Sequence, residues 1–150
     1  FGIHVTTENS PVQPEKFSGY HTGADAEYGD IAGDVEVRAI APGTVVLSRT
    51  ASGYGGVMVI RHTIGGASVL ALYGHLRAST MKPVGTKVAA GEKIAVLGKG
   101  FSSETSGERK HLHFAILRGT SPVLAGYVQT KSALGGWQDP VVFLKKNGAG

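Results

Sequence analysis

Apolar residues recur along this chain in short runs, and glycine or proline separates one run from the next. The segment VEVRAI (35–40) alternates between apolar and polar residues and ends at Ala41-Pro42-Gly43, a typical turn signal. A period of two is typical of β-strands, whose successive side chains point to opposite faces. Similar runs predict further strands over 44–50, 57–62, 68–76 and 111–119, and a turn–strand–turn–strand unit over 83–98.

Turn signals and the scarcity of helical periodicity set the expected fold class. A Gly-Gly pair at 65–66 separates two of these runs, which are therefore predicted to pair as an antiparallel hairpin. An Asp-Pro pair at 139–140 predicts the start of one short helix that extends to 145. We expect an all-β fold, in which a compact antiparallel sheet or sandwich is accompanied by little helix.

The remaining segments lack a clear period. Residues 1–16 are expected to form an extended lead-in with a short strand near 2–6, and the core is expected over 17–145. A chain of 150 residues is long enough to bury one core, so a single domain over 1–150 is predicted. Loops or irregular strands are expected over 19–30, 99–110 and 119–138.

Composition excludes several classes of protein. The chain has no cysteine, which excludes disulfides, thiolate metal ligands and a cysteine nucleophile. No apolar stretch approaches the ~20 residues of a membrane helix, and the opening FGIHVTT lacks the features of a signal peptide. The net charge of +4 favours anionic partners. With one tryptophan and scattered basic residues, however, nucleic-acid binding is not indicated.

Candidate chemistry begins with two histidines at the head of an apolar run, in HLHF (111–114). Because strand residues i and i+2 share a face, His111 and His113 can reach one small object between them. Burying a second histidine on one face is costly unless a partner satisfies it. The ordinary structural interpretation is a solvent-facing pair, or a pair bonded to backbone carbonyls.

Two further positions complete a candidate site. His21 and Asp25 are four residues apart and so share a face of a strand or a helix, and both are common zinc ligands. Together with one of His111 and His113 they make three ligands, the number that catalytic zinc takes from a protein. The other histidine of that pair and His75 would remain as proton carriers beside the metal. His4 and His62 have no such partner pattern and are interpreted as structural.

These residues, in this order, resemble the lysostaphin/LytM-type zinc metallopeptidases, which cut bacterial peptidoglycan. The segments that carry the resemblance are HTGAD (21–25), APGTVV (41–46), GYGGVMVIRH (53–62), LYGHL (72–76), VGTKVAAGEKIAVLG (84–98), HLHF (111–114) and WQDPVVFL (137–144). The resemblance implies a compact antiparallel β fold with a narrow groove over one metal ion. It also implies an extracytoplasmic endopeptidase that acts on the stem or cross-bridge peptide.

The resemblance assigns roles that spacing alone leaves open. His21, Asp25 and His113 match the ligands of one zinc ion per chain, while His75 and His111 match the two catalytic histidines. Two features depart from the family pattern. Ala26 stands where the family commonly has a bulky apolar residue, and Glu-Arg-Lys (108–110) stands where it often has glycine and proline.

Two other functions are compatible with parts of the sequence. A catalytically inactive relative could bind and activate another cell-wall hydrolase, although such relatives typically have eroded ligands. VGTKVAAGEKI (84–94) also resembles the turn–strand units of phosphocarrier and lipoyl-like modules. A phosphocarrier needs no His-x-x-x-Asp pair, and Met81-Lys82-Pro83 is not the lipoyl-lysine motif. A zinc endopeptidase is therefore the preferred hypothesis.

Overall fold

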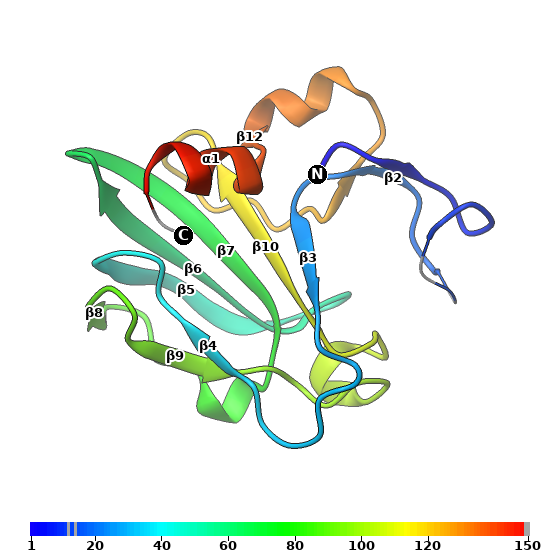
Figure 1. Cartoon of the computed structure of the whole chain (residues 1–150), viewed down its shortest axis with the longest axis horizontal. Helices are drawn as coiled ribbons and strands as arrows, with labels where there is room; N and C mark the ends of the chain where they lie inside the picture. The colour runs from blue at the N-terminus through cyan, green and yellow to red at the C-terminus, as the bar shows by residue number, and fades with distance from the viewer. Residues whose placement is uncertain (12, 14, 149–150) are drawn as a thin grey trace.

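The computed structural model describes residues 1–11, 13 and 15–148, which form short strands, three 3-10 turns and one α-helix (Figure 1). The strands are β1 (His4–Val5), β2 (Gly19–His21), β3 (Ala24–Glu27), β4 (Glu36–Arg38), β5 (Gly43–Ala51), β6 (Gly55–Ile64), β7 (Ala67–Leu76), β8 (Lys87–Val88), β9 (Lys93–Val96), β10 (His111–Leu117), β11 (Tyr127–Val128) and β12 (Trp137–Gln138). The helices are η1 (Ala78–Thr80), η2 (Ser103–Thr105), η3 (Ser132–Gly136) and α1 (Pro140–Lys146). Antiparallel β structure therefore dominates, as the sequence predicts.

One large antiparallel sheet organises the fold. Its strand order is β12-β10-β7-β6-β5-β8. β3 pairs with the first half of β10, on the same edge of β10 that β12 pairs with further along. The longest pairing is the β6–β7 hairpin, in which Ile64 lies opposite Ala67 across the predicted Gly-Gly turn. Side strands form two smaller units, β1-β2-β11 and β4-β9.

Apolar side chains of the central strands pack on both faces of this sheet. In β6, Met58 and Ile60 point to one face while Val57 and Val59 point to the other, as strand alternation requires. The first face is covered by β4, β9 and α1, which lie in front of the sheet in Figure 1. The second face is covered by Trp137 and by segments near the N-terminus and β11. The result is a layered all-β structure with two cores.

The predicted terminal helix is confirmed. Asp139 caps α1, because its Oδ1 accepts hydrogen bonds from the backbone N–H groups of Val141 and Val142 at 2.9 and 3.1 Å. The side chains of Phe143 and Leu144 then pack against the core on the first face of the sheet. No helix in the described part of the chain is long and apolar enough to cross a membrane.

In the lead-in, β1 pairs with β2, and a hydrogen-bonded turn follows over 7–9. Backbone hydrogen bonds join Gly2 N to the His21 carbonyl at 2.8 Å and His21 N to the Ile3 carbonyl at 2.9 Å. Positions 12 and 14 of the lead-in lie outside the described residues. The lead-in therefore holds the end of β2, where His21 lies.

His62 is structural in this fold, as its isolated sequence context indicates. The side chain is fully buried, with Nδ1 2.8 Å from the Ala41 carbonyl and Nε2 2.9 Å from the Tyr73 hydroxyl. Since a carbonyl only accepts, Nδ1 carries the ring proton and the Tyr73 hydroxyl donates to Nε2. Burial lowers the pKa of His62, which keeps the ring neutral.

Candidate metal centre

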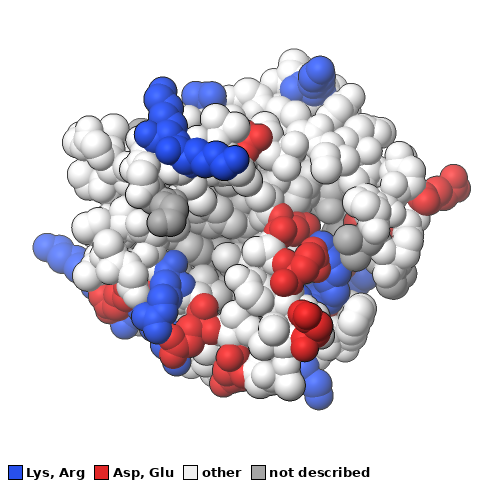
Figure 2. Space-filling view, viewed as in Figure 1, with Lys and Arg blue, Asp and Glu red and all other residues white. Residues whose placement is uncertain are grey.

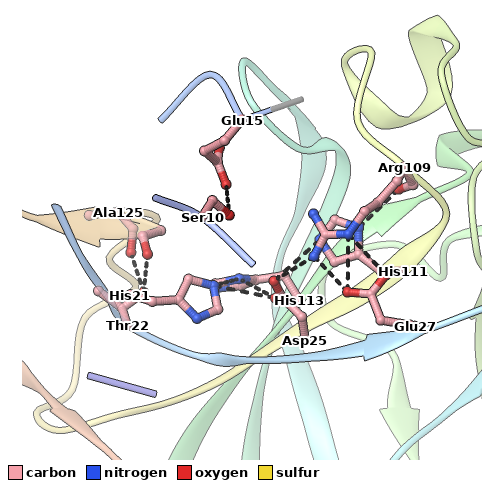
Figure 3. A network of polar contacts seen from close by, with 11 residues as sticks. Ser10, Glu15, His21, Thr22, Asp25, Glu27, Arg109, His111, His113 and Ala125 are labelled. Atoms are coloured by element: carbon pink, nitrogen blue, oxygen red, sulfur yellow. Dashed lines mark hydrogen bonds and ion pairs between the residues drawn. The ribbon is translucent and has the colours of Figure 1, made fainter. Parts of the chain in front are cut away.

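Strand pairing brings the predicted site residues together. In the antiparallel ladder between β3 and β10, Asp25 lies opposite His113 and Glu27 lies opposite His111. His21 ends β2, in the separate β1-β2-β11 sheet, and its side chain reaches the same point, as Figure 3 shows. Residues that are about 90 positions apart in the sequence thus converge because β3 adds to the edge of the main sheet.

Three donor atoms meet at the centre of this group. His21 Nε2 lies 3.1 Å from His113 Nδ1, and Asp25 Oδ1 lies 3.3 Å from His21 Nε2 and 3.2 Å from His113 Nδ1. Tetrahedral zinc with ligand bonds of about 2.0–2.2 Å separates its ligand atoms by about 3.3 Å. The triangle formed by the three atoms therefore has the size that zinc requires.

The carboxylate oxygen in this triangle lacks any other partner among the described residues. Asp25 Oδ1 is buried and accepts no hydrogen bond, although two ring nitrogens lie close to it. A buried carboxylate oxygen without a hydrogen bond is costly unless a cation satisfies it. The donor set of two imidazoles and one carboxylate thus fits a zinc ion, and His21, Asp25 and His113 could hold it.

Protonation states in the cluster also suit a metal. Burial alone would raise the pKa of the Asp25 carboxyl, but His113 and His21 outweigh this effect and hold the pKa well below its usual range. Burial lowers the pKa of His113. Metal ligands must be an ionised carboxylate and neutral imidazoles, which are the forms that these shifts favour.

A glycine between β2 and β3 lets the backbone approach the site. A Cβ atom at Gly23 would lie 2.6 Å from the Phe114 carbonyl oxygen and 2.8 Å from His113 Nε2. The next residue back, Thr22, is fully buried and donates from Oγ1 to the Ala125 carbonyl at 2.8 Å. The turn that places both His21 and Asp25 is therefore fixed by close packing and by a hydrogen bond from the buried Thr22.

His75 and His111 form a second pair beside the triangle, with ring centroids 4.2 Å apart. His75 Nδ1 lies 3.1 Å from the Tyr54 carbonyl, and His111 Nδ1 lies 2.9 Å from the Arg109 carbonyl. Because a carbonyl only accepts, each Nδ1 carries a proton and each Nε2 of a neutral ring has a free lone pair. Both rings can therefore accept a second proton at Nε2.

The environment keeps these two rings neutral. Burial, with His111 and His113 nearby, lowers the pKa of His75 to about 3. Burial also lowers the pKa of His111, although the carboxylate of Asp25 opposes this shift. His75 has a left-handed backbone with φ of 63°, which is unfavourable for a residue with a side chain and is typical of functional sites.

A cleft of about 350 Å³ opens over the five residues. Phe17 and Tyr127 stack with centroids 5.7 Å apart along the cleft. The remaining lining residues are Ser18, Ser52, Gly53, Tyr54, Glu108, Arg109, Leu124, Ala125, Gly126 and Gln129. Figure 2 shows basic and acidic side chains interspersed over one face of the molecule, without a continuous basic surface on that face.

Three further residues contribute to the site, although no sequence pattern assigns them a role there. The Tyr54 ring packs with centroids 5.4 Å from His75 and 5.5 Å from His113. Glu108 is buried, and its Oε1 lies 3.3 Å from Lys16 Nζ, which ties the 99–110 loop to the lead-in. Arg109 bonds to Asp25 and Glu27, so one residue of the Glu-Arg-Lys departure contacts a candidate metal ligand directly.

Comparisons with known proteins agree with this geometry. A profile of peptidase family M23 matches residues 19–145. The murein hydrolase activator EnvC of Escherichia coli is 42% identical over 83 residues, which cover 55% of this chain and 18% of EnvC. An uncharacterised protein of Haemophilus influenzae is 40% identical over 94 residues, which cover 62% of this chain and 21% of that protein. The chain thus spans about a fifth of the length of these two relatives.

A solved structure supports the fold. The structure of LytU superposes with a TM-score of 0.60 over 90% of this chain and 79% of that one, at 24% sequence identity. At that identity the likeness extends to the fold alone. The all-β fold class expected from the sequence is therefore confirmed, both by the strands themselves and by this neighbour.

Proposed function

The chain belongs to peptidase family M23, and from that premise we propose that it is a zinc-dependent endopeptidase that hydrolyses peptide bonds in the stem or cross-bridge of bacterial peptidoglycan. One observation carries the proposal: three donor atoms lie 3.1–3.3 Å apart at the floor of a cleft, beside two imidazoles with free Nε2 atoms. This arrangement has the ligands and the proton carriers that hydrolysis of an amide requires.

In this proposal His21, Asp25 and His113 hold one zinc ion. When bound, zinc supplies a water molecule of lowered pKa and polarises the carbonyl of the substrate. His21 and His113 are buried and hold the Asp25 carboxyl in its ionised form, and the β3–β10 ladder places Asp25 opposite His113.

His111 is assigned the proton transfer. Its Nε2 lies 3.8 Å from Asp25 Oδ2, and this carboxylate stabilises the protonated form of the His111 ring. The surroundings of His75 favour the protonated form of that ring less. Nε2 of His111 accepts the proton of the attacking water and returns it to the amine as the C–N bond breaks. His75 stays neutral, and its Nε2 accepts a hydrogen bond that orients the water.

The surroundings of the cleft suit a wall substrate. Gly53 and Gly126 lie among its walls, so a peptide backbone can approach closely, and the basic balance of +4 suits anionic wall polymers. We accordingly propose an extracytoplasmic place of action and peptidoglycan peptides as partners. Zinc, at one ion per chain, is the proposed cofactor.

A second candidate function is activation of another wall hydrolase without catalysis. The observation that favours it is the 42% identity to a murein hydrolase activator over 83 residues. The presence of all five site residues at the distances given above supports the enzymatic proposal instead, because an activator has no need of a zinc triangle or of paired imidazoles.

One experiment separates these functions. Zinc-loaded protein is incubated with purified walls of defined cross-bridge chemistry, and the released fragments are identified by mass. We expect cleavage of one bond type, loss of zinc in His113→Ala, and retained zinc without turnover in His111→Ala. Walls and cross-bridge peptides left uncut by the zinc-loaded protein would refute the enzymatic proposal. Stimulation of a separate wall hydrolase that persists in His113→Ala would support the activator.

A further inference from the structure

Arg109 links two carboxylates on one face of β3. Asp25 and Glu27 are two residues apart on this strand and so project to the same side. Arg109 Nη2 donates to Asp25 Oδ2 at 3.0 Å and to Glu27 Oε1 at 2.6 Å, while its Nε donates to Glu27 Oε2 at 2.9 Å. Figure 3 shows the guanidinium group between the two carboxylates.

The bond to Asp25 engages the oxygen that does not face the histidines. Oδ2 accepts from Arg109, whereas Oδ1 lies 3.3 Å from His21 Nε2 and 3.2 Å from His113 Nδ1. A carboxylate held at one oxygen by a planar guanidinium cannot rotate freely. The bond from Arg109 therefore keeps Asp25 Oδ1 directed toward His21 and His113 in the metal-free protein.

Glu27 serves this arrangement in two ways. Its two oxygens accept hydrogen bonds from Nε and Nη2 of Arg109 in a bidentate contact, which fixes the plane of the guanidinium group. Its negative charge also compensates the positive charge of Arg109, which would otherwise repel a divalent cation nearby. The Arg109 side chain is largely covered, with an exposed fraction of 19%, and its bond to Asp25 is more shielded from water than its bonds to the half-exposed Glu27.

The same residue also orients a proposed proton carrier. The Arg109 carbonyl accepts from His111 Nδ1 at 2.9 Å, which leaves Nε2 of that ring free. A single residue at the head of β10 thus contacts a proposed metal ligand through its side chain and a proposed proton carrier through its backbone.

We propose that Arg109, anchored by Glu27, is a positioning residue that preorganises the Asp25 carboxylate for metal binding. The inference rests on the proposed function, because it takes Asp25 as a zinc ligand. Groups that hydrogen-bond to metal ligands commonly contribute about 10- to 100-fold to metal affinity. Arg109 is expected to act at that scale.

The decisive variant is charge-neutral. Arg109→Gln alone removes an orienting bond but also removes a positive charge, and these two changes act on zinc affinity in opposite directions. Arg109→Gln combined with Glu27→Gln removes one charge of each sign, so the net charge near the site is unchanged. The matched control is Arg38→Gln combined with Glu36→Gln, an Arg–Glu pair on β4 whose side chains bond to each other outside the cleft.

The measurement is the zinc affinity of the metal-free full chain, by competition with a chromophoric chelator. We expect the Arg109/Glu27 variant to bind zinc about 10- to 100-fold more weakly, Arg109→Lys to lie between it and wild type, and the control pair to match wild type. Cobalt loading adds a second readout, because the visible absorption of Co²⁺ changes with ligand geometry. It should change in the Arg109/Glu27 variant and not in the control.

Unchanged zinc affinity in the Arg109/Glu27 variant would overturn the inference. A merely structural role would lower the thermal stability of the metal-free variant and leave its zinc affinity unchanged, which counts as the same refutation. If the double variant does not fold, Arg109→Lys decides by the same criterion. Wild-type protein that bound no zinc and cut no wall would instead refute the proposed function, so the two failures are distinguishable.

Discussion

Gly23→Ala is predicted to disable the proposed zinc site through one methyl group. The added Cβ would lie 2.6 Å from the Phe114 carbonyl oxygen and 2.8 Å from His113 Nε2, whereas ordinary contacts begin at 3.4 Å. Gly23 has no positive φ, so backbone strain plays no part and the effect is steric alone. Relief requires the turn between β2 and β3 to move by about 0.8 Å, away from a β10 backbone that is locked in the sheet.

Both stability and zinc binding should suffer. Overpacking of this kind costs about 1–3 kcal/mol, which for a chain of this size lowers the melting temperature by about 6 °C. Saturating zinc at about 100 times its Kd should stabilise wild type by about 2.7 kcal/mol. The variant should lose most of that gain, because its displaced turn carries His21 and Asp25.

Thermal unfolding with zinc and with a chelator tests both effects. Gly29→Ala is the matched control, since a Cβ there meets nothing within 4 Å and its φ is not positive. The control should melt close to wild type and keep the zinc-induced shift. A Gly23→Ala protein with wild-type melting and a full zinc shift would show that the turn yields easily, and the steric reasoning would be wrong.

Three further predictions concern single groups. His75→Asn should melt near wild type and bind zinc, because asparagine tolerates the left-handed backbone, yet wall hydrolysis should be lost; retained hydrolysis would remove His75 from the mechanism. Thr22→Val should lower stability by about 1–3 kcal/mol in denaturant unfolding, because the Ala125 carbonyl loses its partner; an unchanged midpoint would contradict this. Metal-free protein should lose stability as pH falls from about 6.5 to about 3. Burial, with His111 and His113 nearby, lowers the pKa of His75 in the folded protein to about 3, so His75 binds a proton in the unfolded chain at a higher pH than in the folded protein. Equal melting at about pH 7.5 and about pH 4.5 would refute that linkage.

The parts of the fold that the sequence predicts well are those with strong local signals. The β6–β7 hairpin has a continuous apolar run on each side of a Gly-Gly turn, and its pairing follows directly from that pattern. The helix at the C-terminus is equally local, because Asp139 and Pro140 are adjacent to the turn that they start.

Local sequence patterns do not predict elements that are stabilised by a strand far away in the sequence. β3 reads ADAE and has little apolar content, so it exists as a strand because β10 supplies its hydrogen bonds. The histidine and aspartate positions could be proposed from spacing and resemblance, since their chemistry is distinctive. The contacts of Arg109 could not, because they follow from the β3–β10 register, which no local pattern encodes.

The short ladder between β3 and β10 has a kinetic consequence. β3 spans Ala24–Glu27 and lies along only the first half of β10, while β12 takes the same edge further on. An edge strand of this length can open by itself, at a small fraction of the free energy needed to unfold the whole domain. In the proposed zinc site Asp25 would leave with it, so fraying of this one strand would set the residence time of the proposed ion. Amide hydrogen exchange in β3 should accordingly slow when metal binds, while exchange in β6 and β7 should barely change.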